Sequence, residues 1–268
     1  FVWDLFDQDG LESVEFIYYA LDDTCDTCWV AIDEVSSPSL TLIDIEPGFH
    51  TFYLKAVDVA GAESNVIHFP DTSNVYELDY WKVKPAVGDI LLVDDFVQDS
   101  QNNALRWYKS ILDSLAGINN YSVWELRREL PYSSIEVKAN LGYFKHVFWN
   151  GAYTGEPLYD DAGSSITSYV LSGGNFFISV AELKDTSFTW FPIDSIVTLT
   201  DEFDQISPKR TFVSQIDSTY NLRTGDEQGI YLEVEGFEND NDPNFRSLYR
   251  LQSPEDMFDE WVGTPNVC

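Results

Sequence analysis

The spacing of apolar residues along the chain changes once, close to Pro85. Before Pro85, apolar and polar residues alternate with the period of two that half-buried strands require. The runs with this alternation are residues 14–23, 28–32, 40–45 and 50–61, with a turn at residues 46–48. Short strands at this spacing predict a β-sandwich over residues 1–84.

After Pro85, short apolar runs alternate with segments of helical spacing. Residues 88–96 predict a first strand closed by two aspartates, and residues 102–117 predict a helix that ends at a glycine. The expected continuation is a strand at 121–126, a short helix or loop at 133–144, a strand at 145–152, a helix at 164–174 and a strand at 175–183. This alternation predicts an α/β domain with a parallel, doubly wound sheet. We expect β-rich additions after Asp185, so the second domain covers residues 85–268 and is incomplete at its C-terminus.

The first domain carries residues that resemble a known family of modules. Trp3 and an aspartate-glycine turn open the domain, and the segments "YALDD" and "GFHTFYLKAVDVAG" follow. This order resembles the immunoglobulin-like or fibronectin type III-like modules of secreted bacterial proteins. The resemblance covers almost the whole first domain and implies a sandwich fold, but it implies no particular ligand.

The second domain resembles another family through the order of its segments "LLVDD", "VWEL", "VFWNGA", "SYVLSGG" and "NFFISV". This order is similar to the flavodoxin-like domains related to class I glutamine amidotransferases. The resemblance implies a nucleophilic cysteine in the turn after the third strand, with a histidine and an acid later in the chain. The chain has Asn150 at that turn, and its last histidine is His146. Since acyl transfer needs both nucleophile and base, we expect no amidotransferase activity.

Ligands of open α/β sheets bind beyond the carboxyl ends of the strands, and five candidate pocket residues lie there. They are Asp94, Asp95, Glu125, Asn150 and Glu182. A hydrolase would need Asp94 or Asp95 to converge with Glu125 or Glu182 at roughly 5 to 9 Å. The other interpretation is that one aspartate caps a loop or the following helix. The turn after the first strand lacks glycine, which argues against a bound phosphate or flavin.

The charge of the chain limits its partners. There are 46 acidic and 15 basic residues, which gives a net charge of −31. Such a surface repels nucleic acid and anionic membrane faces, and it suits surroundings rich in salt or divalent cations. No apolar run approaches the ~20 residues of a membrane-spanning helix. The acidity indicates either a surface that is kept soluble or one that binds calcium.

If calcium is a cofactor, two acidic segments are the expected metal sites. Asp240 and Asp242 belong to an oxygen-rich segment at residues 238–244. Asp7 and Asp9 are spaced as in part of an EF-hand loop, but the first and last ligand positions of that loop would be apolar. A turn stabilised by aspartate side chains explains the same two residues without a metal.

The cysteines indicate the redox compartment. Cys25 and Cys28 form a C-x-x-C motif, while Cys268 has no partner nearby in the sequence. A four-cysteine zinc site would need a second pair, and a thioredoxin-type motif would open a helix rather than lie in an acidic loop. We therefore favour a small loop disulfide between Cys25 and Cys28 over free thiols. A disulfide predicts an oxidising, extracellular setting.

These observations predict a non-catalytic structural, adhesive or assembly fragment of a large secreted or cell-surface bacterial protein. Its expected partners are other domains of the same chain, other extracellular proteins, or glycans. The alternative is an extracellular hydrolase that acts on glycans or peptides with carboxylates at the carboxyl edge of the sheet. A third possibility is carbohydrate binding through exposed aromatic rings, although most of the eight tryptophans are expected in cores.

Overall fold

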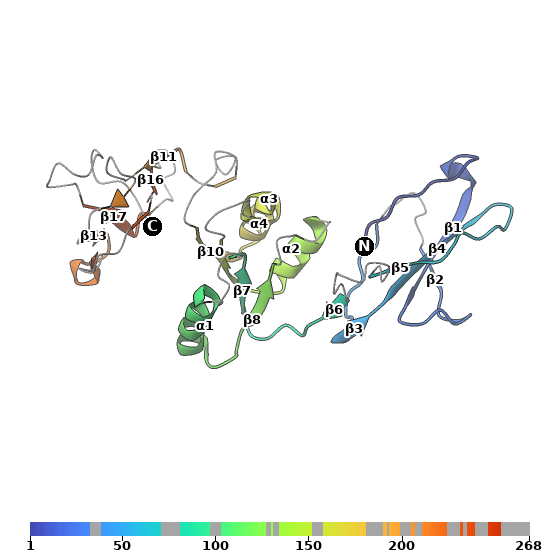
Figure 1. The fold of residues 1–268 in the computed structure, drawn as a ribbon, viewed down its shortest axis with the longest axis horizontal. Helices are drawn as coiled ribbons and strands as arrows, with labels where there is room; N and C mark the ends of the chain where they lie inside the picture. The colour runs from blue at the N-terminus through green and yellow to red at the C-terminus, as the bar shows by residue number, and fades with distance from the viewer. Residues whose placement is uncertain are drawn as a thin grey trace. The chain divides into compact units, whose positions relative to one another are not determined.

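The computed structural model describes residues 1–32, 39–70, 81–96, 103–126, 130, 134–151, 158–180, 190–191, 193–198, 205–206, 211–223, 231–232, 235–238 and 246–252. The chain divides into two compact units, Phe1–Ala86 and Val87–Cys268. Figure 1 draws the first unit in blue to cyan and the second in green to red.

The first unit is built from antiparallel strands, as the period-two pattern predicts. Its four-stranded sheet has the order β2-β1-β4-β5. The strands of this sheet are β1 (Val14–Leu21), β2 (Val30–Ala31), β4 (Phe52–Asp58) and β5 (Ile67–Phe69). A second, two-stranded sheet pairs β3 (Gly48–His50) with β6 (Trp81–Val83), and a 3-10 helix, Leu11–Ser13, precedes β1.

The strand predicted at residues 40–45 is wrong. The described backbone there forms no strand, and the neighbouring Ser39 lies in an isolated bridge with Val2. Leu40 and Leu42 are nevertheless packed against the hydrophobic core. The alternation at 40–45 therefore reflects alternate burial of side chains and not pairing of the backbone.

The core of the first unit lies on one side of the four-stranded sheet. The buried side chains are Trp3, Ile17, Ile32, Phe52 and Leu54. The ring of Phe1 stacks on that of Phe52 with 3.9 Å between centroids. Removing these aromatic and aliphatic surfaces from water is the main term that holds so small a unit together.

The second unit contains the parallel sheet that the sequence predicts. Its strands are β7 (Ile90–Asp94), β8 (Ser122–Glu125), β9 (His146–Asn150) and β10 (Asn175–Ser179). The sheet has the order β10-β9-β7-β8, and all three strand pairs are parallel. Numbered from β7, the strands thus lie in the order 2-1-3-4.

Helices cover both faces of this parallel sheet (Figure 1). On one face, α1 (Asn103–Ala116) buries Leu105 and Leu112 against Leu92, and it ends at Gly117, whose φ is +96°. The opposite face, formed by Leu91, Val93, Val147 and Trp149, is covered by α2 (Ser134–Gly142), α3 (Leu158–Asp161) and α4 (Gly163–Leu171). Alternate residues of a strand point to opposite faces, which explains the continuous apolar runs of β7 and β9.

The remainder of the second unit is antiparallel, in line with the expected β-rich additions. β11 (Ser195–Thr198) pairs with β16 (Glu235–Glu238), and β12 (Gln205–Ile206) pairs with β15 (Tyr231–Leu232). A three-stranded sheet joins β14 (Leu222–Arg223), β13 (Thr211–Ser214) and β17 (Tyr249–Leu251), with a 3-10 helix at Ser218–Tyr220. Among the described helices of the chain, none is long and apolar enough to cross a membrane.

Candidate functional site

The parallel register brings three of the five candidate pocket residues to one level of the sheet. Asp94 is paired with Glu125 on one side and with Asn150 on the other. Neighbouring strands lie about 4.8 Å apart, so Asp94 is flanked by both side chains. The Asn150 Nδ2 atom donates to Asp94 Oδ1 at 3.4 Å. Glu182 lies outside the described residues.

Asp95 follows Asp94 directly but has a different environment. It is 1% exposed, and its Oδ2 atom accepts from Trp149 Nε1 at 3.1 Å and from the backbone N–H of Leu158 at 3.0 Å. Leu158 is the first residue of α3, where backbone N–H groups lack partners within the helix. Asp95 therefore caps a helix, but the helix is α3 and not α1, which follows Asp95 in the sequence.

Burial changes the acidity of both aspartates. It raises the pKa of Asp95 to about 6, against the opposing effect of the hydrogen bonds from Trp149 and Leu158. Burial also raises the pKa of Asp94, and the charge of Glu125 acts in the same direction, while the hydrogen bond from Asn150 lowers it. Raised carboxyl pKa values occur in active sites and in structural networks alike, so the partners decide between the two.

The described acids at this edge do not converge on a metal site. Among the described residues, the only group of three or more His, Cys, Asp or Glu side chains with ligand atoms within 4.8 Å of one another is Asp23, Cys25 and Cys28. Asp94 lies among side chains of the strand ends, whereas Asp95 is bonded to Trp149 and α3. Adjacent residues of an extended segment point apart, and that is the arrangement here.

The turn after β9 is shaped by close packing. The Gly151 N–H donates to Ser179 O at 2.8 Å, and a Cβ atom at Gly151 would lie 2.5 Å from Val180 Cγ1. Any side chain at Gly151 would thus require the Val180 side chain to shift.

His146 lies at the opposite end of the same strand. It is the first residue of β9, and its ring Nδ1 is 3.2 Å from Asn175 Nδ2. At the rise of an extended strand, the Cα atoms of His146 and Asn150 are about 13 Å apart. His146 therefore cannot serve as a base at the carboxyl edge of the sheet.

Asp7 and Asp9 belong to a tight turn. The Asp9 N–H donates to Asp7 Oδ1 at 2.8 Å, and this hydrogen bond lowers the pKa of Asp7. Gly10 follows with φ of +103°, a conformation that favours glycine. The hydrogen bonds account for both aspartates as turn residues. Asp240 and Asp242, the other expected calcium ligands, lie outside the described residues.

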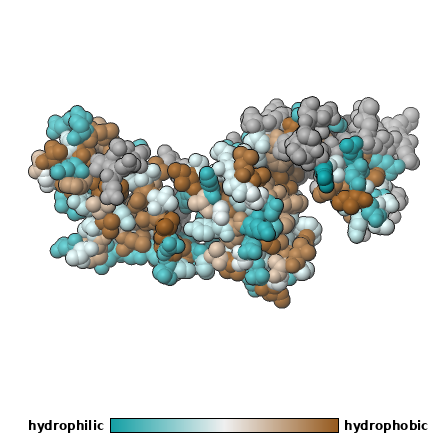
Figure 2. All heavy atoms as spheres, turned by 180° about the vertical axis from the view of Figure 1, so that it is seen from behind, coloured by the Kyte–Doolittle hydropathy of each residue, from teal (hydrophilic) through white to brown (hydrophobic). Residues whose placement is uncertain are grey.

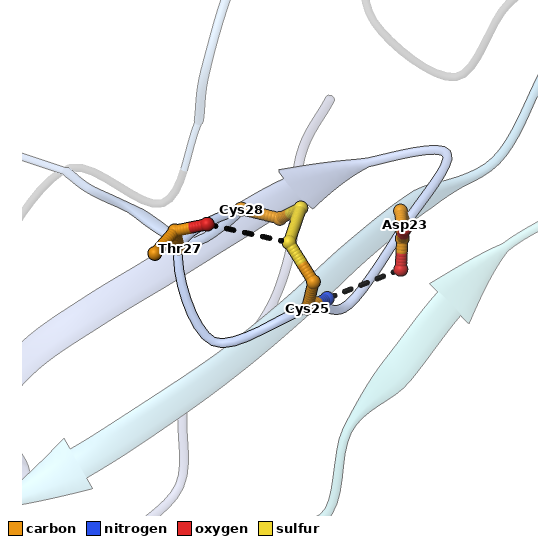
Figure 3. The surroundings of a disulfide bond; sticks show 4 residues. All are labelled: Asp23, Cys25, Thr27 and Cys28. Atoms are coloured by element: carbon orange, nitrogen blue, oxygen red, sulfur yellow. Dashed lines mark hydrogen bonds between the residues drawn. A yellow bond between two sulfur atoms is a disulfide. The ribbon is translucent and has the colours of Figure 1, made fainter.

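Cys25 and Cys28 are joined by a disulfide, with their Cα atoms 5.1 Å apart. Figure 3 shows the loop: Asp23 Oδ1 accepts from the Cys25 N–H at 3.1 Å, and Thr27 Oγ1 lies 3.6 Å from Cys25 Sγ. Asp23 lies close enough to both sulfurs to complete a metal-binding group. Since thiolates, and not disulfide sulfurs, bind metals, the oxidised loop has no such role.

The comparisons with known proteins identify no family. No family model matches the chain, and no curated protein matches it. One solved structure, described as a "putative polysaccharide deacetylase" of Bacillus anthracis, is similar with a TM-score of 0.20 and 11% sequence identity. The alignment covers 62% of this chain and about 60% of the length of that protein. At this TM-score the similarity carries no inference about fold or function.

The structure also contains a histidine network that the sequence did not predict. The His50 Nδ1 atom is 2.8 Å from Asp22 Oδ2, and His50 Nε2 is 2.6 Å from Glu46 O. Asp22 Oδ1 accepts from the Thr51 N–H at 2.9 Å. Asp22 and His50 are 28 residues apart, so no local pattern in the sequence links them. The only signal was the pair of aspartates that follows the first strand.

Proposed function

We propose that this chain is a non-catalytic structural, adhesive or assembly part of a larger secreted or cell-surface bacterial protein. The observation that carries the proposal is the role of Asp95. Among the described acids at the carboxyl edge of the parallel sheet, the most deeply buried one is bonded to Trp149 and to the start of α3. These two donors occupy Oδ2 of Asp95, and Oδ1 is buried without a hydrogen-bond partner, so neither oxygen is open to a substrate from which it could take a proton.

The proposed fold follows the two family resemblances. The strand order 2-1-3-4 supports a flavodoxin-like, amidotransferase-like second domain, because that order starts the doubly wound sheet of flavodoxins. In such a domain the nucleophile would stand where this chain has Asn150, and no histidine follows His146. The antiparallel sheet over the Trp3 core supports an immunoglobulin-like or fibronectin type III-like first domain.

The proposed location outside the cell rests on the loop disulfide and the charge. Disulfides persist in oxidising compartments, and the net charge of −31 keeps a surface hydrated among extracellular cations. The proposed partners are neighbouring domains of the same chain, other extracellular proteins and glycans.

A second candidate function, hydrolysis of glycans or peptides, is favoured by one observation. Asp94 has a raised pKa and lies beside Glu125 and Asn150, at the edge where open α/β sheets bind ligands. A carboxyl group with a raised pKa is suited to donate a proton to a leaving group.

An activity screen separates the two candidates. The purified chain is incubated with cellulose, chitin, casein and glutamine, and the release of reducing sugar, amines and ammonia is measured. We expect no turnover above that of buffer. Turnover that disappears in both Asp94→Asn and Glu125→Gln, but persists in the exposed control Glu15→Gln, would establish the hydrolase and overturn the non-catalytic proposal.

A further inference from the structure

Apolar side chains reach the surface of the molecule among hydrophilic ones, as the face drawn in Figure 2 shows. In the first unit, the sheet β2-β1-β4-β5 gives these side chains a regular arrangement. Ile17 and Leu54 point into the core, so the alternate positions of β1 and β4 point to the outer face. The outward side chains are exposed or half-buried, except that of Ala20.

Aromatic residues dominate the outer face. Pairing places Tyr18 opposite Lys55, and Ala20 opposite Tyr53, which is in turn paired with His68 of β5. Phe16, on the same side of β1 as Tyr18, has its ring 5.8 Å from the Tyr18 ring. The fifth ring is that of Trp29, which directly precedes β2. We call Phe16, Tyr18, Trp29, Tyr53 and His68 the aromatic face.

Lys55 holds the middle of the aromatic face in place. Its ammonium group lies 4.8 Å from the centre of the Trp29 ring and 5.9 Å from that of Tyr18. Glu63 Oε2 neutralises this group at 3.0 Å, and the Lys55 side chain is only 16% exposed. Ammonium groups favour the faces of aromatic rings, so these contacts restrict the Trp29 and Tyr18 rings before any ligand binds.

Ala20 makes the face continuous across the strands. It is completely buried although it points outward, so the side chains around it close over its methyl group. Three spacings between the four strands give the face a width of roughly 14 Å from β2 to β5. The rings therefore extend across the whole width of the sheet, from β2 to β5.

We propose that the aromatic face binds a neutral polysaccharide chain. Sugar rings have apolar faces of C–H groups, which pack on aromatic rings, and hydroxyl groups at their edges, which need hydrogen-bond partners. The aromatic face offers both, since the hydroxyls of Tyr18 and Tyr53, the indole N–H of Trp29 and the Lys55–Glu63 pair accompany the rings. The proposal deepens the proposed function, since glycans are among the proposed partners, and it rests on that function for the extracellular setting.

The charge of the chain selects among glycans and against other polymers. At a net charge of −31, the protein repels anionic polysaccharides such as heparin. The cation of the aromatic face, Lys55, is already paired with Glu63. Aromatic side chains are also enriched in protein–protein interfaces, so retention on a polysaccharide, rather than the composition of the face, decides for a glycan over a protein partner.

The test is retention of the full chain on insoluble cellulose and chitin, on a neutral β-glucan in affinity electrophoresis, and on heparin. We expect binding to at least one neutral polysaccharide and none to heparin. Trp29→Ala and Tyr53→Ala should each weaken binding about tenfold, because each removes one ring from the contact. The matched control is Trp107→Ala on α1, a tryptophan that is 58% exposed in the other unit and should bind as the unaltered chain does.

Each outcome decides the proposal. Melting temperatures show whether a variant is folded, and Tyr53→Phe, which keeps the ring, should retain most of the affinity. Retention on none of the neutral polysaccharides, retention on heparin alone, or equal retention of the folded Trp29→Ala and Tyr53→Ala variants overturns it. Reducing sugar released from the bound polysaccharide would instead contradict the non-catalytic role and leave the aromatic face standing.

Discussion

Two aspartates at the ends of strands, Asp22 in the first unit and Asp95 in the second, do the same task in opposite surroundings. Each ties a distant segment to its sheet through both its backbone and its side chain. Asp95 is buried, and burial raises its pKa to about 6 although its neutral donors act in the opposite direction. Burial acts on Asp22 in the same direction, but the hydrogen bonds from Thr51 and His50 outweigh it and its pKa is lowered.

The comparison teaches that a strand-terminal aspartate says little about chemistry until its partners are known. Asp95 stabilises the fold although its carboxyl group lies away from water, where the charged form is disfavoured. Asp22 instead contacts His50, a partner that can itself carry a charge.

Substitution of Asp95 should have the largest effect on stability. Asp95→Ala leaves the Trp149 indole N–H and the Leu158 N–H buried without acceptors, so the second unit should lose about 2–4 kcal/mol of unfolding free energy. Asp95→Asn keeps one acceptor oxygen and should lose less. Urea denaturation followed by tryptophan fluorescence measures both, with Asp94→Asn as the neighbouring control. A loss no larger than that of Asp94→Asn would show that the cap on α3 is not structural.

The sequence predicted the framework that holds Asp95 but not its role. Apolar runs located β7, β8, β9 and β10, and the glycine at 117 located the end of α1, because these signals are local. The bond from Asp95 to Leu158 spans 63 residues, and α3 is only four residues long, so neither left a periodic signal. The pairing of Asp22 with His50 was missed for the same reason.

The pH dependence of the second unit should reveal the raised pKa of Asp95. A carboxyl group with a folded pKa above its unfolded value, about 3.9, binds its proton more tightly in the folded state. Its contribution to stability is therefore complete below about pH 4 and is lost as the pH rises through about 6. Relative to Asp95→Asn, the unaltered unit should lose roughly 2–3 kcal/mol across this window. Parallel curves for the two proteins would contradict the raised pKa.

His50 should give the first unit a smaller dependence at higher pH. The hydrogen bond to Asp22, followed by that to the Glu46 carbonyl, raises the pKa of His50, because two acceptors require a proton on each ring nitrogen. This contribution is complete below about pH 6.5, the unfolded pKa, and is lost as the pH rises through the higher folded value. Melting temperatures between pH 5.5 and 8.5 should fall for the unaltered chain and for the control His68→Gln. The fall should be absent in His50→Gln, and its persistence there would assign it to another group.

The smallest effect is expected at the exposed aspartates of the first unit. The Asp7 carboxylate already accepts the Asp9 N–H, so the turn occupies one oxygen of Asp7. Added sodium chloride should stabilise the chain by screening its charge of −31.

If calcium binds specifically, it should raise the melting temperature more than sodium does at equal ionic strength, as mass action requires. We expect Asp240→Asn with Asp242→Asn to remove such an increment, and Asp7→Asn with Asp9→Asn to leave it unchanged. Loss of the increment only in the Asp7→Asn with Asp9→Asn variant would contradict this expectation, because aspartates that stabilise a turn would then also bind the metal.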